Sequence, residues 1–264
     1  MNYDEIRKRA ATESTVSVPA TWAQGRTVFG GLSAALLADT LSRQNEDDRR
    51  LRYLEIGFVR PLMTEHPFEL SSEPISSGRT VAVQSGQIVQ DGAVRVTAQA
   101  NFVRALASET PVEIDNFKAP ELIPPDHEHC HRVEGAVAPV FTQHIDFRFA
   151  GGGAPFSGRG SDELCGWMRF DEPPAQLDTT HLVTLIDAWP PLVSSYYKRP
   201  VSMSSVNWQL HFAEPVDGIS GSEFLGYRAH ANFFRDGYGS SSAEIWAPDG
   251  RLLAKSFQTF LVFS

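Results

Sequence analysis

One aspartate in the second half of the chain occupies a position that its own predicted helix disfavours. The residues from Leu182 to Trp189 have apolar side chains at i, i+3, i+4 and i+7, which predicts an amphipathic helix, and Asp187 lies just off that stripe in the last turn. The helix dipole disfavours a carboxylate there by a few tenths to about 1 kcal/mol. Such an acid suggests a catalytic function, whereas the structural alternative is a solvated aspartate beside the core. Asp39, its counterpart in the first predicted helix, is the alternative acid.

A serine and a glutamine in two predicted strands are further candidates. Alternation along residues 205–212 places the apolar side chains that begin with Val206 on one face and the polar side chains that begin with Ser205 on the other. The polar face could simply be wetted by solvent. Gln258 lies in an apolar strand where the first half of the chain has Ala100 at the corresponding position. A glutamine at a position where the other copy has alanine suggests a functional role for its side chain.

These positions correspond because the chain contains the same structural unit twice. Residues 91–102 are echoed at 249–260, and residues 57–61 are echoed at 211–215, in the same order. Each copy also has a predicted helix ahead of its strands. A duplicated helix-plus-sheet unit predicts two half-domains that dock and form a site between them. Since the candidate polar residues belong to the second copy, we expect the chemistry there.

Periodicity predicts an α+β fold in which each unit has one helix laid across an antiparallel sheet. The first unit spans 1–105, and its predicted elements are a helix over 28–43 and strands over 54–59, 68–76, 80–90 and 94–103. The segment 106–139 is rich in proline and acidic residues and is predicted to be a linker. The second unit spans 140–264, and its predicted elements are strands over 142–149 and 165–170, a glycine spacer at 151–153, a helix from a Thr179 or Thr180 cap to Ala188, and three later strands.

The composition is typical of a folded protein. A chain of 264 residues with 42% hydrophobic composition can bury a full core. No apolar run approaches the roughly 18 residues that a membrane span needs, and the polar start 1–5 gives no expectation of export. The net charge of −9 argues against nucleic acid as a partner, although a few local arginines could hold a small anion.

The cysteines and the clustered histidines predict neither a disulfide framework nor a metal site. Cys130 and Cys165 lie in unlike contexts, which is typical of a protein from a reducing, cytoplasmic compartment. His127, His129 and His131 flank the first of these cysteines and resemble metal ligands. Their spacing matches no standard zinc pattern and they lie in the predicted linker, so we expect no metal.

A pair of glycines, Gly30 and Gly31, begins the first predicted helix. Paired glycines commonly provide only a tight turn. The functional alternative is that backbone N–H groups at this helix start, which carry partial positive charge, face an oxygen of a ligand. The second copy has the bulkier segment 179–181 near the equivalent place, where it would crowd a carbonyl. We therefore expect one complete site in each chain.

Four motifs taken together resemble those of the acyl-CoA thioesterase II family. They are Val28–Gly31, Gly57–Pro61, Ser77–Thr80 and Leu253–Gln258, in this order across both halves. The resemblance implies a double hotdog fold, in which two units, each a long helix wrapped by an antiparallel sheet, are joined in one chain. It implies an enzyme that hydrolyses an acyl-coenzyme A to free acid and coenzyme A without a cofactor. Resembling proteins often cover their sheet edges by association, so we expect a homodimer.

The resemblance also implies which residues act on the water. In that family an aspartate on the second helix, a threonine early in the following strand and a glutamine in the last strand position and activate it. These look like Asp187, Ser205 and Gln258, with serine in place of threonine and Ser204 adjacent. Thioester hydrolysis needs an oriented water, a general base and donors for the developing oxyanion. It requires no cysteine or histidine nucleophile, and the sequence has no Gly-x-Ser-x-Gly elbow.

Four further residues are expected to contact the substrate. We expect the backbone N–H groups of Gly31 and Leu32 to form the oxyanion site. Arg60 and Arg79 are candidates for contacts with coenzyme A phosphates, and the alternative is that both are surface residues. The length of the acyl chain is left open, because aromatic residues such as Trp22 could line a tunnel or belong to the core.

Two other functions compete with hydrolysis. A hotdog hydratase or dehydratase, acting on enoyl- or 3-hydroxyacyl-CoA, uses a paired acid and histidine in resembling families, and Asp187 has no histidine shortly after it in its helix. The alternative from another class is an acyl-CoA-binding module without catalysis, since serine in place of threonine is compatible with a decayed site. Release of free coenzyme A separates these functions.

Overall fold

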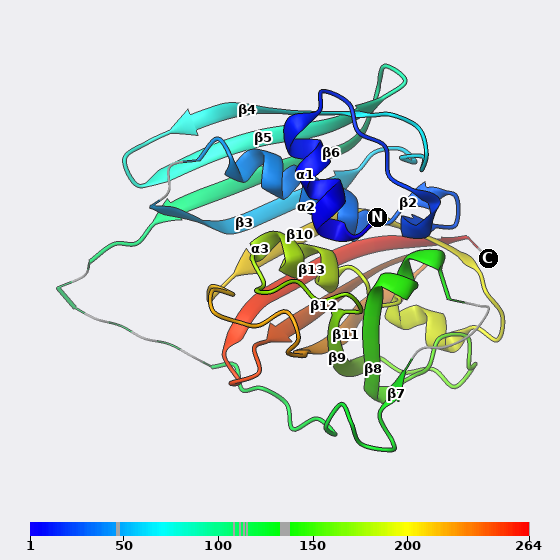
Figure 1. Ribbon diagram of the computed structural model, residues 1–264. Coiled ribbons are helices and arrows are strands. Elements are labelled where there is room, and N and C mark those ends of the chain that lie inside the picture. The colour runs from blue at the N-terminus through cyan, green and yellow to red at the C-terminus, as the bar shows by residue number, and fades with distance from the viewer. Residues whose placement is uncertain are drawn as a thin grey trace.

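The computed structural model describes residues 1–45, 48–107, 109–110, 112, 114, 116–132 and 138–263. It contains an antiparallel sheet of eleven strands, and two helices, α2 (Gly30–Ser42) and α3 (Thr179–Ile186), pack together against it (Figure 1). The architecture is the predicted α+β arrangement of two helix-on-sheet units.

Each half contributes one central helix and a block of neighbouring strands. The elements of the first half are α1 (Tyr3–Thr12), η1 (Ala20–Trp22), β1 (Ala23–Gln24), β2 (Thr27–Val28), α2, β3 (Arg49–Phe58), β4 (Glu69–Ser77), β5 (Val81–Gln90) and β6 (Ala93–Arg104). The elements of the second half are β7 (His131–Arg132), η2 (Val140–His144), β8 (Ile145–Gly152), β9 (Glu163–Phe170), α3, η3 (Leu192–Tyr196), β10 (Ser202–Phe212), β11 (Leu225–Arg235), β12 (Tyr238–Trp246) and β13 (Leu252–Phe263).

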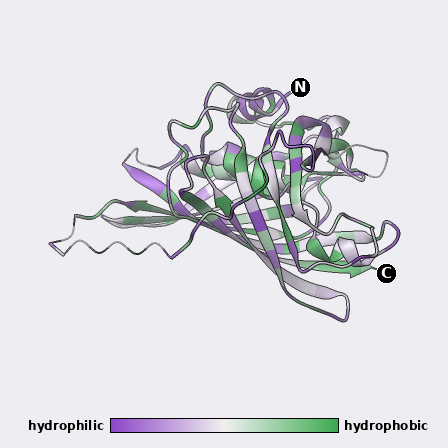
Figure 2. Ribbon diagram, turned by 90° about the horizontal axis from the view of Figure 1, so that it is seen from below, coloured by the Kyte–Doolittle hydropathy of each residue, from purple (hydrophilic) through white to green (hydrophobic). Residues whose placement is uncertain are grey.

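The two halves share one continuous sheet because β3 pairs with β10. The strand order is β4-β5-β6-β3-β10-β13-β12-β11-β9-β8-β7, and the joint is antiparallel, from Tyr53 opposite His211 to Gly57 opposite Asn207. Apolar and polar residues alternate along several strands (Figure 2), as expected for a sheet with one face on the core. The segments that resemble each other at 57–61 and 211–215 thus lie at opposite ends of the joint.

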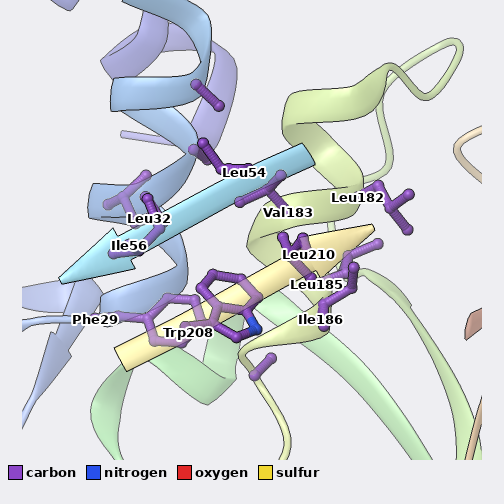
Figure 3. Close-up of a cluster of buried hydrophobic side chains, with 14 of the residues drawn as sticks. Phe29, Leu32, Leu54, Ile56, Leu182, Val183, Leu185, Ile186, Trp208 and Leu210 are labelled. Atoms are coloured by element: carbon purple, nitrogen blue, oxygen red, sulfur yellow. The ribbon is translucent and has the colours of Figure 1, made fainter. Parts of the chain in front are cut away.

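The core lies where α2 and α3 meet the two joined strands. Figure 3 shows Leu54 and Ile56 of β3 and Leu210 of β10 directed toward Leu32 of α2 and Val183 of α3, and all five side chains are fully buried. Burying such a side chain contributes about 1.5–3 kcal/mol. Small residues and leucines cover α2 on every side, which allows it to pack against both α3 and the sheet.

Two aromatic stacks fix the beginning of α2 against the second half. Phe29, which precedes the helix, stacks on Phe141 with ring centroids 3.9 Å apart, and Trp22 stacks on His144 at 4.0 Å. Stacked pairs of this kind add about 0.5–1.5 kcal/mol beyond the area that they bury. The position of this helix start relative to the second half is therefore set by packing.

The predictions for the strands were wrong in several places, and one of them is the start of the strand predicted over 142–149, where η2 extends to His144. Four strands follow α3, not three, because β11 and β12 form a hairpin at Asp236 and Gly237, where φ is +52° and +76°. The predicted glycine spacer 151–153 is partly strand, since β8 continues to Gly152. A bulge between Phe149 and Gly151 and the close approach of Gly152 to Glu163 explain why glycines occur inside this strand.

The predicted helices differ from the structure at their ends. The N-cap of α3 is Asp178, whose side chain accepts hydrogen bonds from the amides of Thr180 and His181, so neither Thr179 nor Thr180 is the cap. The helix ends at Ile186, two residues earlier than predicted. The N-terminal helix α1 was not predicted, although Asn2 and Glu5 form a capping box that signals its start.

The chain between β6 and β7 contains no helix or strand among its described residues. The ammonium group of Lys255 lies 4.0 Å from the centroid of the Phe117 ring, and Trp167 donates a hydrogen bond to the carbonyl of Ile123, so this segment runs along the second half. Residues 108, 111, 113, 115 and 133–137 of the predicted linker lie outside the described residues. The division of the chain at 105 and 139 remains a prediction.

Candidate active site

The structure brings Asp187 and Ser205 into contact with the same side chain, that of Gln258. The Nε2 atom of Gln258 lies 2.8 Å from Oδ1 of Asp187 and 2.8 Å from Oγ of Ser205. An ionised carboxylate only accepts hydrogen bonds, so the amide nitrogen must face it. The amide therefore uses both of its hydrogens to link the acid to the hydroxyl, and the hydroxyl keeps its own proton for another acceptor.

A β-bulge in β10 places Ser205 in this cluster. Ser205 lies opposite Phe260 on β13, Trp208 lies opposite Gln258, and Val206 has no partner between them. The extra residue reverses the alternation, so that Ser205 shares the core-facing side of the strand with Trp208. The prediction that Ser205 shares a face with Asn207, opposite to Trp208, was therefore wrong.

The start of α2 compensates for the unfavourable position of Asp187. This residue is the C-cap of α3, and it accepts a hydrogen bond from the backbone N–H of Gly31 in the first turn of α2. The partial positive charge of one helix start thus faces an anion held at the end of the other helix. The ligand oxygen expected at Gly31 is, in this structure, the chain's own carboxylate.

Close packing explains why glycine occurs at positions 30 and 31. Backbone conformation does not explain it, because neither residue is left-handed. A Cβ atom on Gly30 would lie 2.6 Å from Oδ2 of Asp187 and 3.2 Å from the ring of Phe58. A Cβ atom on Gly31 would lie 2.7 Å from the carbonyl oxygen of Thr184 in α3. The two glycines therefore permit the close approach of α2 to Asp187 and to α3. Their role is more than the tight turn that paired glycines commonly provide.

Desolvation sets the acidity of the candidate base. Burial raises the pKa of Asp187 to about 7, while the hydrogen bonds from Gln258 and from Gly31 act in the opposite direction. Tyr227 is close enough that the charge of Asp187 adds to the effect of burial in raising the pKa of its phenol. Trp189 stacks on Tyr227 with centroids 4.6 Å apart. An aromatic wall of this kind explains the low polarity around the carboxylate.

The counterpart acid in the first half has different surroundings. Asp39 is buried and pairs with Arg7 of α1 at 2.8 Å and with Arg43 at 2.5 Å. Arg7 also pairs with Asp178 at the start of α3. Two arginines therefore hold Asp39 in a structural ion pair that bridges three helices.

The strand positions beside Asp39 carry no polar groups. Leu51 lies opposite Phe102 and Leu54 lies opposite Ala100, in the same register that Ser205 and Gln258 have in the second half, and β3 has an equivalent bulge between Leu51 and Tyr53. Leucine and alanine side chains neither donate nor accept hydrogen bonds. Of the two acids, Asp187 alone accepts a hydrogen bond from a side-chain amide among the described residues, and that amide also binds a hydroxyl.

Comparisons with known protein families match both halves of the chain. Sequence profiles of the acyl-CoA thioesterase N-terminal domain and C-terminal domain match residues 18–111 and residues 119–262. The chain belongs to the acyl-CoA thioesterase family. Its resemblance to the thioesterase II branch, inferred from four motifs, is confirmed.

Solved structures similar to this thioesterase-family chain support the fold. A protein of unknown function with a hot dog fold from Alicyclobacillus acidocaldarius has 26% identity and a TM-score of 0.82 over 95% of this chain and 92% of that one. An acyl-CoA thioesterase II from Mycobacterium marinum has 17% identity and a TM-score of 0.71 over 94% and 92%. The double hotdog fold is therefore confirmed. A search of curated proteins finds no match.

The remaining residues predicted for the thioesterase site are not all near it. Arg60 follows the end of β3 that carries Phe58, is exposed, and donates to the carbonyl of Val94 at 3.4 Å. Arg79 lies in the turn between β4 and β5, beside Gly78, which accepts a hydrogen bond from Arg49 at the opposite end of β3. β3 has 10 residues at about 3.3 Å each, so the two arginines are separated by roughly 30 Å along the strand. Arg60 and Arg79 of one chain therefore do not lie at the same site.

Neither Ser204 nor Leu32 contributes a side chain to the polar cluster. Ser204 is exposed, lies opposite Leu261 on the far face of β13 from Gln258, and donates to the carbonyl of Ser205. Of the two adjacent serines, Ser205 is therefore the one that contacts Gln258. Leu32 is buried in the first turn of α2, where its side chain belongs to the core.

Metal ligands do not gather in the described part of this thioesterase-family chain. No group of three or more His, Cys, Asp or Glu side chains that could hold a metal ion occurs among the described residues. Cys130 and Cys165 are buried free thiols, and burial raises the pKa of each. Within the same ranges, no helix is long and apolar enough to span a membrane.

Gly30→Ala is expected to lower the turnover number roughly tenfold to a hundredfold without unfolding the protein, because the new methyl group must displace the Asp187 carboxylate. Gly226→Ala is the matched control, since its Cβ atom would lie an ordinary 3.4 Å from Trp246. Initial rates of coenzyme A release from both variants test this. Equal activity of the two variants would show that the contact between Gly30 and Asp187 has no role in positioning the acid.

Proposed function

We propose that this chain hydrolyses acyl-coenzyme A thioesters to a free carboxylic acid and coenzyme A. The observation that carries the proposal is the contact of one amide, Gln258 Nε2, with both Asp187 and Ser205. This arrangement brings a carboxylate, a hydroxyl and an amide close together, and the attacking water is proposed to bind beside them. Membership of the acyl-CoA thioesterase family supports the choice of substrate.

In the proposed reaction Asp187 acts as the general base. Water attacks the thioester carbon while Asp187 takes one of its protons, and the tetrahedral intermediate then releases the coenzyme A thiolate, which regains a proton from Asp187. A base whose pKa is about 7 is suited to both transfers near neutral pH. Ser205 and Gln258 fix the direction from which the water attacks.

The developing oxyanion needs donors that Asp187 does not already use. Phe29, the N-cap of α2, provides no side-chain hydrogen bond to the first turn, and the amide of Gly31 serves Asp187. We therefore assign the oxyanion contact first to the amide of Leu32, with the hydroxyl proton of Ser205 as the second donor. Arg60, which lies at the end of β3 near this cluster, is the proposed contact for a coenzyme A phosphate.

The structure offers less to the competing reactions. Dehydration or hydration of an acyl-CoA would need a histidine beside the acid, and among the described residues Asp187 is hydrogen-bonded to Gln258 and Gly31 only. His181, the histidine nearest to Asp187 in sequence, is engaged elsewhere, since it binds Asp178. Hydrolysis is the better fit.

A direct assay tests the proposed function. The protein is incubated with acyl-CoAs of increasing chain length and a thiol reagent, and release of free coenzyme A is followed. Turnover on at least one chain length is expected, together with a free acid in equal amount. Binding without release would favour the non-catalytic module, and absence of turnover on every chain length in folded protein would refute hydrolysis.

We also propose a cytoplasmic location and a homodimer. The two free cysteines fit a reducing compartment. The sheet ends in β4 on one side and in the two-residue strand β7 on the other, and an uncovered long edge such as β4 is commonly protected by association.

A further inference from the structure

A pocket of about 280 Å³ lies between the two halves, away from the proposed active site. Its walls come from the end of α2, the start of β3, the start of α3 and the segment after β10. The lining residues are Ser42, Asn45, Arg49, Arg50, Leu51, Arg52, Phe102, Thr179, Leu182, Phe212, Glu214, Pro215, Val216 and Asp217.

The internal duplication shows where this pocket lies in the fold. Leu51 and Phe102 in its wall occupy the register positions that Ser205 and Phe260 have in the second half. Thr179 begins α3 as Gly30 begins α2. The pocket is thus the first half's equivalent of the space beside the proposed catalytic hydroxyl.

This space has lost the means to activate water. Leucine and alanine replace the serine and the glutamine, and Asp39 is held by Arg7 and Arg43. The hollow nevertheless persists, although leucine and phenylalanine side chains line it. A retained hollow without catalytic groups is suited to binding alone.

The walls of the pocket combine apolar surface with arginine side chains. Leu51, Phe102, Leu182, Phe212 and Val216 are buried and form the apolar part. Arginine is the residue best suited to a planar carboxylate, because its guanidinium group offers paired donors.

Three arginines at the start of β3, Arg49, Arg50 and Arg52, supply the positive charge. Arg52 donates to the carbonyls of Ala213 at 2.5 Å and Phe212 at 3.3 Å, and it pairs with no carboxylate in the described part of the chain. Arg50 lies 3.9 Å from Asp217, and both side chains are mostly exposed. Arg49 donates to the carbonyl of Gly78 at 2.7 Å. The pocket is also lined by two acids, Glu214 and Asp217, and both are exposed. The three arginines therefore outnumber the acids around the pocket.

We propose that this pocket binds a small free carboxylic acid. The carboxylate would lie on Arg50 and Arg52, and the apolar tail would lie against Phe102 and Leu182. At about 280 Å³ the pocket is slightly below the usual range of about 300–1,000 Å³ for ligand sites, so an acyl-coenzyme A does not fit within it. Such an acid is chemically the product of the proposed hydrolysis, and that identity rests on the proposed function, whereas the binding itself does not.

Titration calorimetry with hexanoate and with hexan-1-ol tests the proposal. The protein should bind hexanoate, and the alcohol should bind at least tenfold more weakly because it has no charge for the arginines. Arg52→Gln and Arg50→Gln should each weaken hexanoate binding about tenfold. Lys198→Gln, a change to an exposed cation outside the pocket, is the control and should leave the affinity unchanged.

A substitution that fills the pocket gives an independent readout. Leu51→Trp should abolish hexanoate binding, and the two arginine variants keep the proposal testable if this core variant fails to fold. Hexanoate binding that survives the arginine substitutions, or no binding by the unsubstituted protein, would overturn the inference. Coenzyme A release without acid binding would refute only the pocket, and acid binding without coenzyme A release would refute only the proposed hydrolysis.

Discussion

Replacing Gln258 with alanine is expected to remove nearly all thioester hydrolysis, by about a hundredfold to a thousandfold in kcat. Among the described residues, the amide of Gln258 links the acid to the hydroxyl, and its loss leaves Asp187 and Ser205 without this common partner. Steady-state rates of coenzyme A release measure the effect. Gln209→Ala is the matched control, because Gln209 lies on the adjacent strand but on the opposite face from the cluster, and its activity should be close to normal.

The same substitution tests whether each chain has one site. The first half has Leu51 and Ala100 in place of Ser205 and Gln258, and Arg7 is paired with Asp39. A non-hydrolysable acyl-CoA analogue should therefore saturate the protein at one equivalent for each chain. Two equivalents bound, or substantial activity left in Gln258→Ala, would mean that the first half has kept a working site.

Asp187→Asn is expected to lower turnover by about a hundredfold or more, because the water loses its general base. In the unsubstituted protein kcat/KM should rise with pH through about 7, the value to which burial raises the pKa of Asp187. The base acts only when it is deprotonated, so activity is lost as the pH falls below this value. A full pH profile of both proteins tests the prediction, since the asparagine variant should lack that rise.

Stability measurements separate loss of the base from loss of the fold. The pKa of Asp187 in the folded protein lies above the value of about 3.9 for an unfolded aspartate, so the ionised group lowers the free energy of unfolding as the pH rises from about 4 to about 7. Asparagine cannot ionise. The variant should therefore melt at the same temperature as the unsubstituted protein, or higher, at pH 8.

Asp39→Asn is the control for the choice of acid. Its activity should stay close to normal, while its stability should fall because Arg7 and Arg43 lose a buried charged partner. If this variant loses turnover and Asp187→Asn does not, the assignment of the two halves is reversed.

The sequence by itself determined the architecture and the half that carries the polar cluster. Strand and helix periodicities are local properties, and they identified α2, α3 and most strands of the first half to within about two residues, whereas β3 begins at Arg49 and was predicted to begin at 54. The repeat of 91–102 at 249–260 aligned Gln258 with Ala100, and the structure places both at the same register position. The correspondence between the two copies could therefore be found without the tertiary structure.

Only the tertiary structure decided how these residues meet. The face on which Ser205 lies depends on an unpaired residue in β10, and an alternation of period two cannot reveal a bulge. The partner of Asp187 at Gly31, the pairing of Arg7 with Asp39 and the distance between Arg60 and Arg79 depend on contacts between distant segments. Packing of one helix end against another sets these contacts, and hydrophobic periodicity records which face is buried but not what it is buried against.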